Sequence, residues 1–172
     1  GWMVAPGLAF ASVNERAWEA ASRCTTPRFY FDLARAKKSL ASGETPWTPA
    51  VSIFFQMDKA LDLMFAEGID NIYARHARHG RMVRDGARAI GLELFASEGV
   101  ESNTVTAIRV PEGVKGGDWL RVAREEFNTV FAGGQGELSG KIIRFGHLGY
   151  CTDEHVASGL QALEGSLARV RG

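Results

Sequence analysis

A short predicted strand between two glycine-rich segments most constrains what this chain can fold into. Residues 141–145 read Lys-Ile-Ile-Arg-Phe, and glycines cluster on both sides of them at Gly133, Gly134, Gly136, Gly146 and Gly149. Glycines allow the chain to enter and leave a strand sharply. Arg144 lies near the end of this strand, where its planar fork of donors could bind a carboxylate through two hydrogen bonds. A surface arginine in an ordinary hairpin is the simpler interpretation of the spacing alone.

The pattern around this strand predicts a small α+β domain from Gly91 onward. Strands are expected at 92–95, 103–110, 129–132 and 141–145, with a helix at 118–128. Thr152 is a suitable N-cap for a last helix with an apolar stripe of Val156, Leu160, Leu163, Leu167 and Val170. We therefore expect helices on one face of a mostly antiparallel sheet.

The first half of the chain predicts one buried strand and four helices. The strand is expected at 8–13, and the helices at 15–22, at 32–40, from Pro49 to Gly68 and at 70–90. Asn14 is the expected N-cap of the first helix, and Thr48 that of the third. The amides at the start of the third helix, with the hydroxyls of Thr45, Thr48 and Ser52, could bind an anion. A well-capped helix without a ligand explains the same residues.

Composition disfavours several classes of function. The 20 basic and 20 acidic side chains cancel, which leaves no electrostatic footprint for nucleic acid or an anionic membrane. No apolar run approaches the length of a membrane span. Cys24 and Cys151 have no metal-ligand spacing, which favours a reducing compartment, the cytoplasm. His76 and His79 lack further ligands, so hydrogen bonding on the helix surface explains them better than a metal.

Several segments together resemble one enzyme family. The segment 133–146 is similar to the C-terminal signature of the class V aminotransferases that depend on pyridoxal phosphate (PLP), the serine–pyruvate and alanine–glyoxylate type. Residues 5–10, 45–52, 67–78 and 91–95 resemble other parts of that family, in the same order. The resemblance implies an α/β fold, namely the C-terminal half of a fold-type I PLP transferase.

The same resemblance implies a division of the chain. Residues 1–69 would complete the large cofactor-binding domain and its dimer contacts, 70–90 would form a bridging helix, and 91–172 would form the small C-terminal domain. The parent enzyme would move an amino group from alanine or serine to a keto acid such as glyoxylate or pyruvate, with PLP as cofactor.

The resemblance also implies roles for individual residues. Arg144 would bind the α-carboxylate of the substrate, and Thr48 or Thr45 would contact the PLP phosphate of the neighbouring subunit in a homodimer. The lysine that forms the Schiff base would stand one position before Gly1. The chain is therefore expected to be a fragment, inactive without its N-terminal half.

Two alternatives remain open from the sequence. Some relatives in this family are labelled as subunits of a soluble hydrogenase, which would make the chain a non-catalytic partner, although two isolated cysteines cannot supply iron–sulfur or nickel ligands. A PLP lyase or desulfurase would need a nucleophilic cysteine near the substrate, and Cys151 follows the arginine strand closely.

Overall fold

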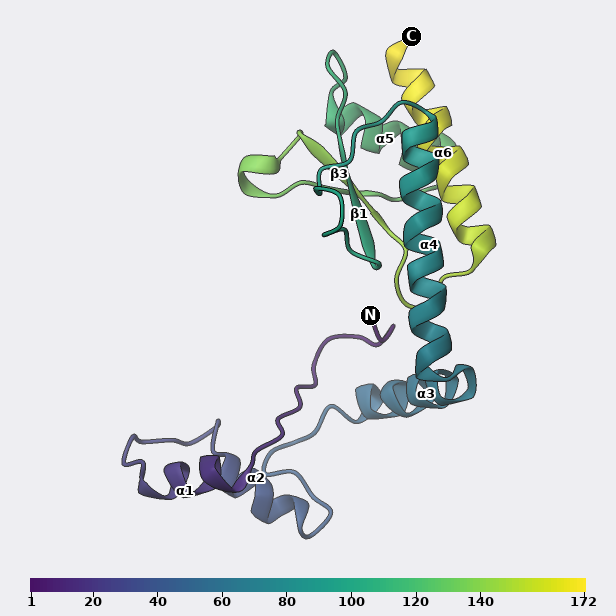
Figure 1. Cartoon of the computed structure of the whole chain (residues 1–172). Coiled ribbons are helices and arrows are strands. Elements are labelled where there is room, and N and C mark those ends of the chain that lie inside the picture. The colour runs from purple at the N-terminus through teal and green to yellow at the C-terminus, as the bar shows by residue number, and fades with distance from the viewer. The chain divides into compact units, whose positions relative to one another are not determined.

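The computed structural model describes all 172 residues, which form two compact units. One unit comprises Val4–Leu61, and the other comprises Gly1–Met3 together with Asp62–Gly172. Figure 1 follows the chain through its elements, from α1 in purple to α6 in yellow. We describe each unit by itself.

The unit Val4–Leu61 contains α1 (Glu15–Arg23), α2 (Leu33–Leu40) and the beginning of α3 (Val51–Glu67). The predicted cap of the first helix is confirmed, and the second helix has a cap that was not predicted. The Asn14 side chain accepts a hydrogen bond from the Ala17 amide at 3.0 Å, and Asp32 accepts bonds from the two amides at the start of α2. None of these three helices contains a fully buried residue.

Two predictions for this unit are wrong. Residues 8–13 form no strand, and Phe10 is 72% exposed, because no neighbouring strand offers them hydrogen-bond partners. Helix α3 begins at Val51 rather than directly after Thr48, since its first α-helical hydrogen bond joins the Phe54 amide to the Ala50 carbonyl.

The second unit contains a three-stranded antiparallel sheet with the order β1-β3-β2. Its strands are β1 (Val105–Arg109), β2 (Ala132–Gly133) and β3 (Ile142–Gly146). The strands predicted at 103–110 and 141–145 are thus confirmed as β1 and β3. The strand expected at 92–95 is reduced to one bridge, Leu94 to Ile108, and the strand expected at 129–132 is shortened and shifted to β2.

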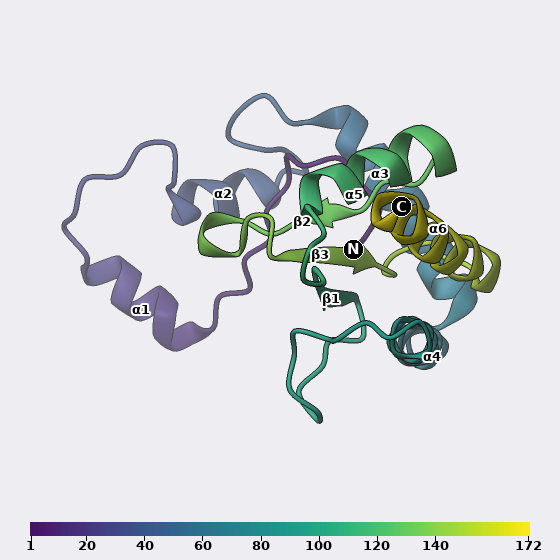
Figure 2. The same cartoon turned by 90° about the horizontal axis from the view of Figure 1, so that it is seen from above.

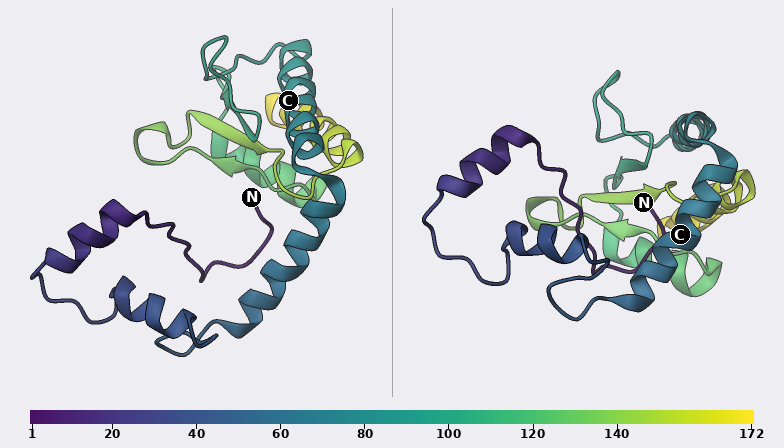
Figure 3. Two further views of the ribbon diagram at one scale, coloured as in Figure 1. Left: turned by 60° about the horizontal axis from the view of Figure 1, so that its bottom comes forward. Right: turned by 90° about the horizontal axis from the view of Figure 1, so that it is seen from below.

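Three helices cover one face of this sheet (Figure 2). They are α4 (Ile69–Ala89), α5 (Gly116–Phe127) and α6 (Asp153–Arg171), with a 3₁₀ turn η1 (Gly136–Leu138) before β3. Helices α4 and α6 run side by side in both views of Figure 3. Thr152 caps α6 as predicted, by accepting a hydrogen bond from the His155 amide.

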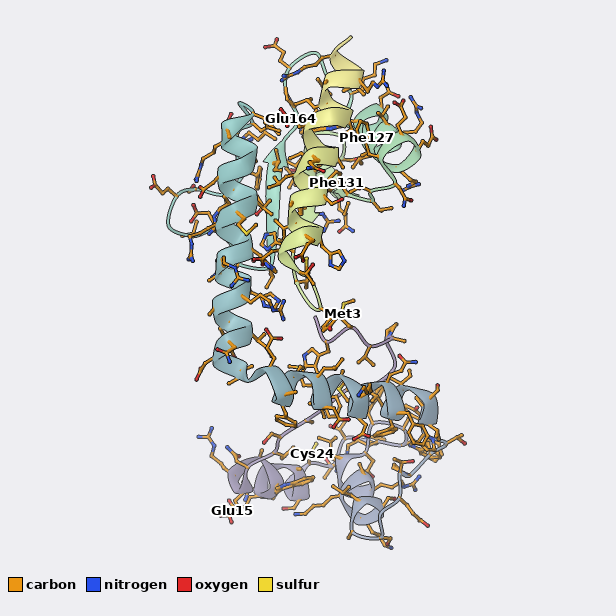
Figure 4. The ribbon with its side chains drawn as sticks, turned by 90° about the vertical axis from the view of Figure 1, so that its right-hand side faces the viewer. Met3, Glu15, Cys24, Phe127, Phe131 and Glu164 are labelled. Carbon is orange, nitrogen blue, oxygen red and sulfur yellow. The ribbon has the colours of Figure 1, made fainter.

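The core lies between the sheet and these helices. Trp119 of α5, Ile143 of β3 and Leu163 of α6 have no exposed surface. The indole Nε1 of Trp119 donates to the Ser166 hydroxyl at 2.9 Å, so the largest buried side chain also has its polar atom satisfied. Phe127 and Phe131 lie beside α6 in the same layer (Figure 4). The apolar stripe predicted for α6 therefore faces the core.

Candidate functional site

Arg144 lies on the face of the sheet opposite the helices. Its neighbours Ile143 and Phe145 both belong to the core, and side chains alternate along a strand, so the Arg144 side chain points to the open face. The strand register places Ala107 of β1 and Ala132 of β2 directly beside it. These two small side chains leave room around the guanidinium.

One backbone hydrogen bond fixes the Arg144 side chain. Its Nε donates to the Gly133 carbonyl at 2.9 Å. No carboxylate of the chain pairs with Arg144, so its two terminal amino groups remain available. An arginine that is anchored through Nε and has two free parallel donors is suited to hold a carboxylate. The geometry is thus consistent with the predicted receptor.

The glycine-rich turn before β3 is tightly packed at Gly134. A side chain at this position would overlap the Leu138 carbonyl, and its Cβ would also lie 2.9 Å from Cγ1 of Ile142. The Gly134 amide donates to the Ile142 carbonyl at 3.1 Å. Only glycine fits here, and the compact turn holds the neighbouring Gly133 carbonyl in place for Arg144.

His147 continues the backbone just after β3 and is buried. Its amide donates to the Thr104 carbonyl at 3.0 Å, and its Nε2 lies 3.0 Å from the Thr106 hydroxyl. Burial and then the nearby Arg84 guanidinium lower the pKa of His147 to about 4. The imidazole is therefore neutral near pH 7, and the chain leaves β3 along a fixed path.

Thr45 and Thr48 lie in the other unit, on the loop before α3. Both are exposed. The Thr45 hydroxyl donates to the Trp47 carbonyl at 2.5 Å, so its proton already has an acceptor in the chain. Thr48 has no such internal bond and precedes the 17-residue helix α3. The two threonines differ accordingly in their availability for a ligand.

His76 and His79, the two histidines of α4, have different environments. His76 is half-buried and bonds to backbone atoms on both ring nitrogens. His79 is fully buried, with its Nε2 2.7 Å from Asp153 Oδ1, so the expectation that it lies on the helix surface is wrong. No group of three or more histidine, cysteine, aspartate or glutamate side chains could hold a metal ion.

Cys24 and Cys151 are both free thiols. Cys151 is partly buried, and burial raises the pKa of its thiol. A raised pKa reduces the fraction of thiolate, which is the nucleophilic form. Cys151 is therefore poorly suited to attack a substrate in the environment that the structure gives it.

Sequence reasoning missed an ion pair between the end of α3 and helix α4. Arg75 of α4 binds Glu67 through Nε at 2.6 Å and through the adjacent amino group at 2.9 Å. The hydrogen bond from Arg75 lowers the pKa of the Glu67 carboxyl, which stays ionised. Helix α4 contains several arginines, and no local sequence pattern separates Arg75 from the others.

Similarity to other proteins extends over nearly the whole length of this chain. The small subunit of a soluble hydrogenase from Synechococcus sp. is 40% identical over 99% of this chain and 44% of its own length. A serine–glyoxylate aminotransferase from Hyphomicrobium methylovorum is 35% identical over 97% of this chain and 42% of its own. No protein-family model matches the chain.

The comparison with solved structures also finds an aminotransferase. A pyridoxamine–pyruvate aminotransferase from Mesorhizobium loti superposes with a TM-score of 0.85 and 33% identity, over 93% of this chain and 42% of that one. The fold is thus that of the C-terminal part of a PLP-dependent transferase. Relatives that are named aminotransferases thus confirm the predicted resemblance.

The chain spans less than half the length of these relatives. None of its helices combines the length and apolar composition that a membrane crossing requires.

Proposed function

We propose that the protein containing this sequence is a PLP-dependent aminotransferase. It would move an amino group between a small amino acid, alanine or serine, and a keto acid, glyoxylate or pyruvate. The observation that carries the proposal is Arg144, anchored to the Gly133 carbonyl with both amino groups unpaired on the open face of the sheet. The aminotransferase relatives support the same reaction class.

Arg144 would bind the group that both substrates share. The amino acid and the keto acid each carry an α-carboxylate, so one receptor can hold either in turn. Binding this group through two hydrogen bonds fixes the direction in which Cα and its substituents point. Ala107 and Ala132 flank Arg144 on the neighbouring strands, and their small size suits a small substrate.

The residues present fit one part of a PLP site. When bound, PLP supplies the electron sink for breaking bonds at Cα. Thr48 offers an exposed hydroxyl in front of the N-terminal end of α3, a combination suited to a phosphate. Thr45 already donates to Trp47, which favours Thr48 as the contact. The lysine that anchors the cofactor would precede Gly1.

The remaining parts of the chain would serve the same enzyme. Residues 1–69 would belong to the large domain and carry the dimer contacts, 70–90 would bridge, and 91–172 would form the small domain. Thr48 would reach the cofactor of the neighbouring subunit in a homodimer. The two free thiols suit the reducing cytoplasm, where we expect the enzyme to act.

One relative's name favours a second function. The Synechococcus protein is described as a hydrogenase subunit, so the chain could belong to a non-catalytic partner. Cys24 and Cys151 fall in different units, and neither stands in a group of metal-ligand residues. The aminotransferase is therefore the better-supported proposal, and the raised pKa of Cys151 disfavours a desulfurase.

Replacing Arg144 with lysine tests the proposal in the protein that also carries the cofactor lysine. A single ammonium cannot reproduce the two-bond fork, so KM for the amino acid should rise roughly 10- to 100-fold while the cofactor absorbance stays unchanged. Arg109→Lys is the control, because Arg109 pairs with Glu93 on the same sheet. Equal KM values for all three proteins would overturn the role of Arg144. Retained PLP without any transamination would favour the partner-subunit alternative.

A further inference from the structure

Helix α4 holds the segment that follows the Arg144 strand. We name residues 147–152, between β3 and α6, the exit loop. The remaining amino group of Arg75 donates to the carbonyls of Gly149 at 2.9 Å and Cys151 at 3.0 Å. The rest of its guanidinium is bound to Glu67, and only 17% of the side chain is exposed. Arg75 therefore uses its whole guanidinium to bind Glu67 and the backbone of the exit loop.

His76, the next residue of α4, binds the same loop through the backbone N–H of Gly149. Its Nε2 accepts the Gly149 amide at 3.1 Å, while its Nδ1 donates to the Ile72 carbonyl at 2.7 Å. The two bonds require the neutral tautomer with the proton on Nδ1. Both the N–H and the C=O of Gly149 are thus bonded to neighbouring residues of one helix.

A third contact reaches Gly149 from the start of the chain. Gly149 has a φ of +77°, and a Cβ at this position would lie 2.7 Å from Sδ of Met3. Figure 4 shows Met3 beside the loop that leads into α6. Residues 1–3 belong to the same compact unit as the exit loop. Gly149 is therefore the point where α4, the exit loop and the first residues meet.

We infer that Arg75 and His76 are positioning residues for Arg144. By fixing Gly149, they set the end of β3, and hence Arg144, relative to residues 1–3. The exit loop has little freedom to absorb a shift, because His147 is buried and its amide is bonded to Thr104. This inference rests on the proposed function, in which Arg144 binds the substrate and the cofactor lysine directly precedes Gly1.

The chemistry of the contacts explains why an arginine is needed at position 75. One guanidinium simultaneously binds both oxygens of Glu67 and two carbonyls of the exit loop. A lysine has a single nitrogen and could satisfy only some of these acceptors. Arg75→Lys should therefore hold the loop less firmly than wild type, yet better than Arg75→Gln.

Amide hydrogen exchange on the 172-residue chain tests directly whether Arg75 holds the exit loop in place. Arg75→Gln should accelerate exchange at residues 147–151 roughly tenfold, because it removes charge-assisted hydrogen bonds. The amides of α5 should be unaffected. Arg121→Gln, which removes an exposed ion pair with Glu125 on α5, should leave the exit loop unchanged. Unchanged exchange in both Arg75 variants would overturn the inference, and Arg75→Lys serves if Arg75→Gln fails to fold.

Kinetics in the protein that carries the cofactor lysine separate positioning from simple stability. Arg75→Gln should raise KM for the amino acid about fivefold or more with bound cofactor unchanged, and Arg75→Lys should recover part of the loss. Faster loop exchange with unaltered KM would assign Arg75 a structural role only. If Arg144→Lys raises KM and Arg75→Gln does not, positioning fails while the carboxylate receptor stands. If Arg144→Lys has no effect, the proposed function itself fails.

Discussion

The imidazole of His147 lies against the hydroxyl of Thr106, with Nε2 and Oγ1 3.0 Å apart and both side chains buried. This contact joins the exit loop to β1. Burial, Arg84 and His79 all disfavour a proton on His147, and together with His76 they lower its pKa to about 4. The imidazole of this pair is therefore neutral near pH 7.

This arrangement predicts a loss of stability in mild acid. The folded-state pKa of His147 lies below its ordinary value of 6.5, so the unfolded chain takes up the proton first. The contribution is complete above pH 6.5 and is lost as the pH falls toward 4, to a total of about 3 kcal/mol. Urea unfolding at several pH values, compared with His147→Gln, measures it. Parallel pH profiles for the two proteins would contradict the prediction.

The tight packing of the turn before β3 predicts that adding one methyl group at Gly134 destabilises the chain. Gly134→Ala should lower the free energy of unfolding by about 2 kcal/mol, because the new Cβ would overlap the Leu138 carbonyl. Gly117→Ala is a matched control, since no atom lies within 4 Å of its added Cβ on helix α5. That control should stabilise the chain by about 0.5 kcal/mol. Equal unfolding midpoints in urea for the two variants would argue against a tightly packed turn.

The loop before α3 predicts which threonine contacts the cofactor phosphate. In the protein with its cofactor lysine, Thr48→Val should raise the Kd for PLP about tenfold, through loss of a hydrogen bond to a charged acceptor. Thr45→Val should have a smaller effect, because Thr45 already donates to the Trp47 carbonyl. Mixed dimers with one Thr48→Val subunit should lose affinity at the partner's site. A larger effect from Thr45→Val would transfer the contact to that residue.

Local signals were sufficient for the starts of two helices. Asn14 and Thr152 each carry a side-chain oxygen at the start of an amphipathic segment, and both cap helices as expected. Capping depends on atoms only two or three residues away, so the sequence contains the whole interaction. The strand at 8–13 was wrong for the complementary reason. Its apolar pattern shows that the segment suits a sheet, but the pattern contains no information on whether a partner strand is there.

The candidate site was predictable in part. The glycines around residues 141–145 indicated where Arg144 would lie, and β3 is found there. The hydrogen bonds from Arg75 to the exit loop were not predictable, because Arg75 and Gly149 are 74 residues apart. No local sequence feature distinguishes Arg75 from the other arginines of α4. The burial of His79 escaped prediction similarly, since its partner Asp153 comes from the start of another helix.

The position of the core along the sequence has a consequence for synthesis on the ribosome. Every buried hydrophobic residue lies between Val83 and Leu167, and α6 contributes Val156, Ala162, Leu163 and Leu167. The earlier helices contain no buried side chain around which to collapse. A nascent chain therefore cannot close this core until α6 has left the exit tunnel. Until then, the apolar face of the sheet stays uncovered, and exposed apolar surface of this kind promotes aggregation.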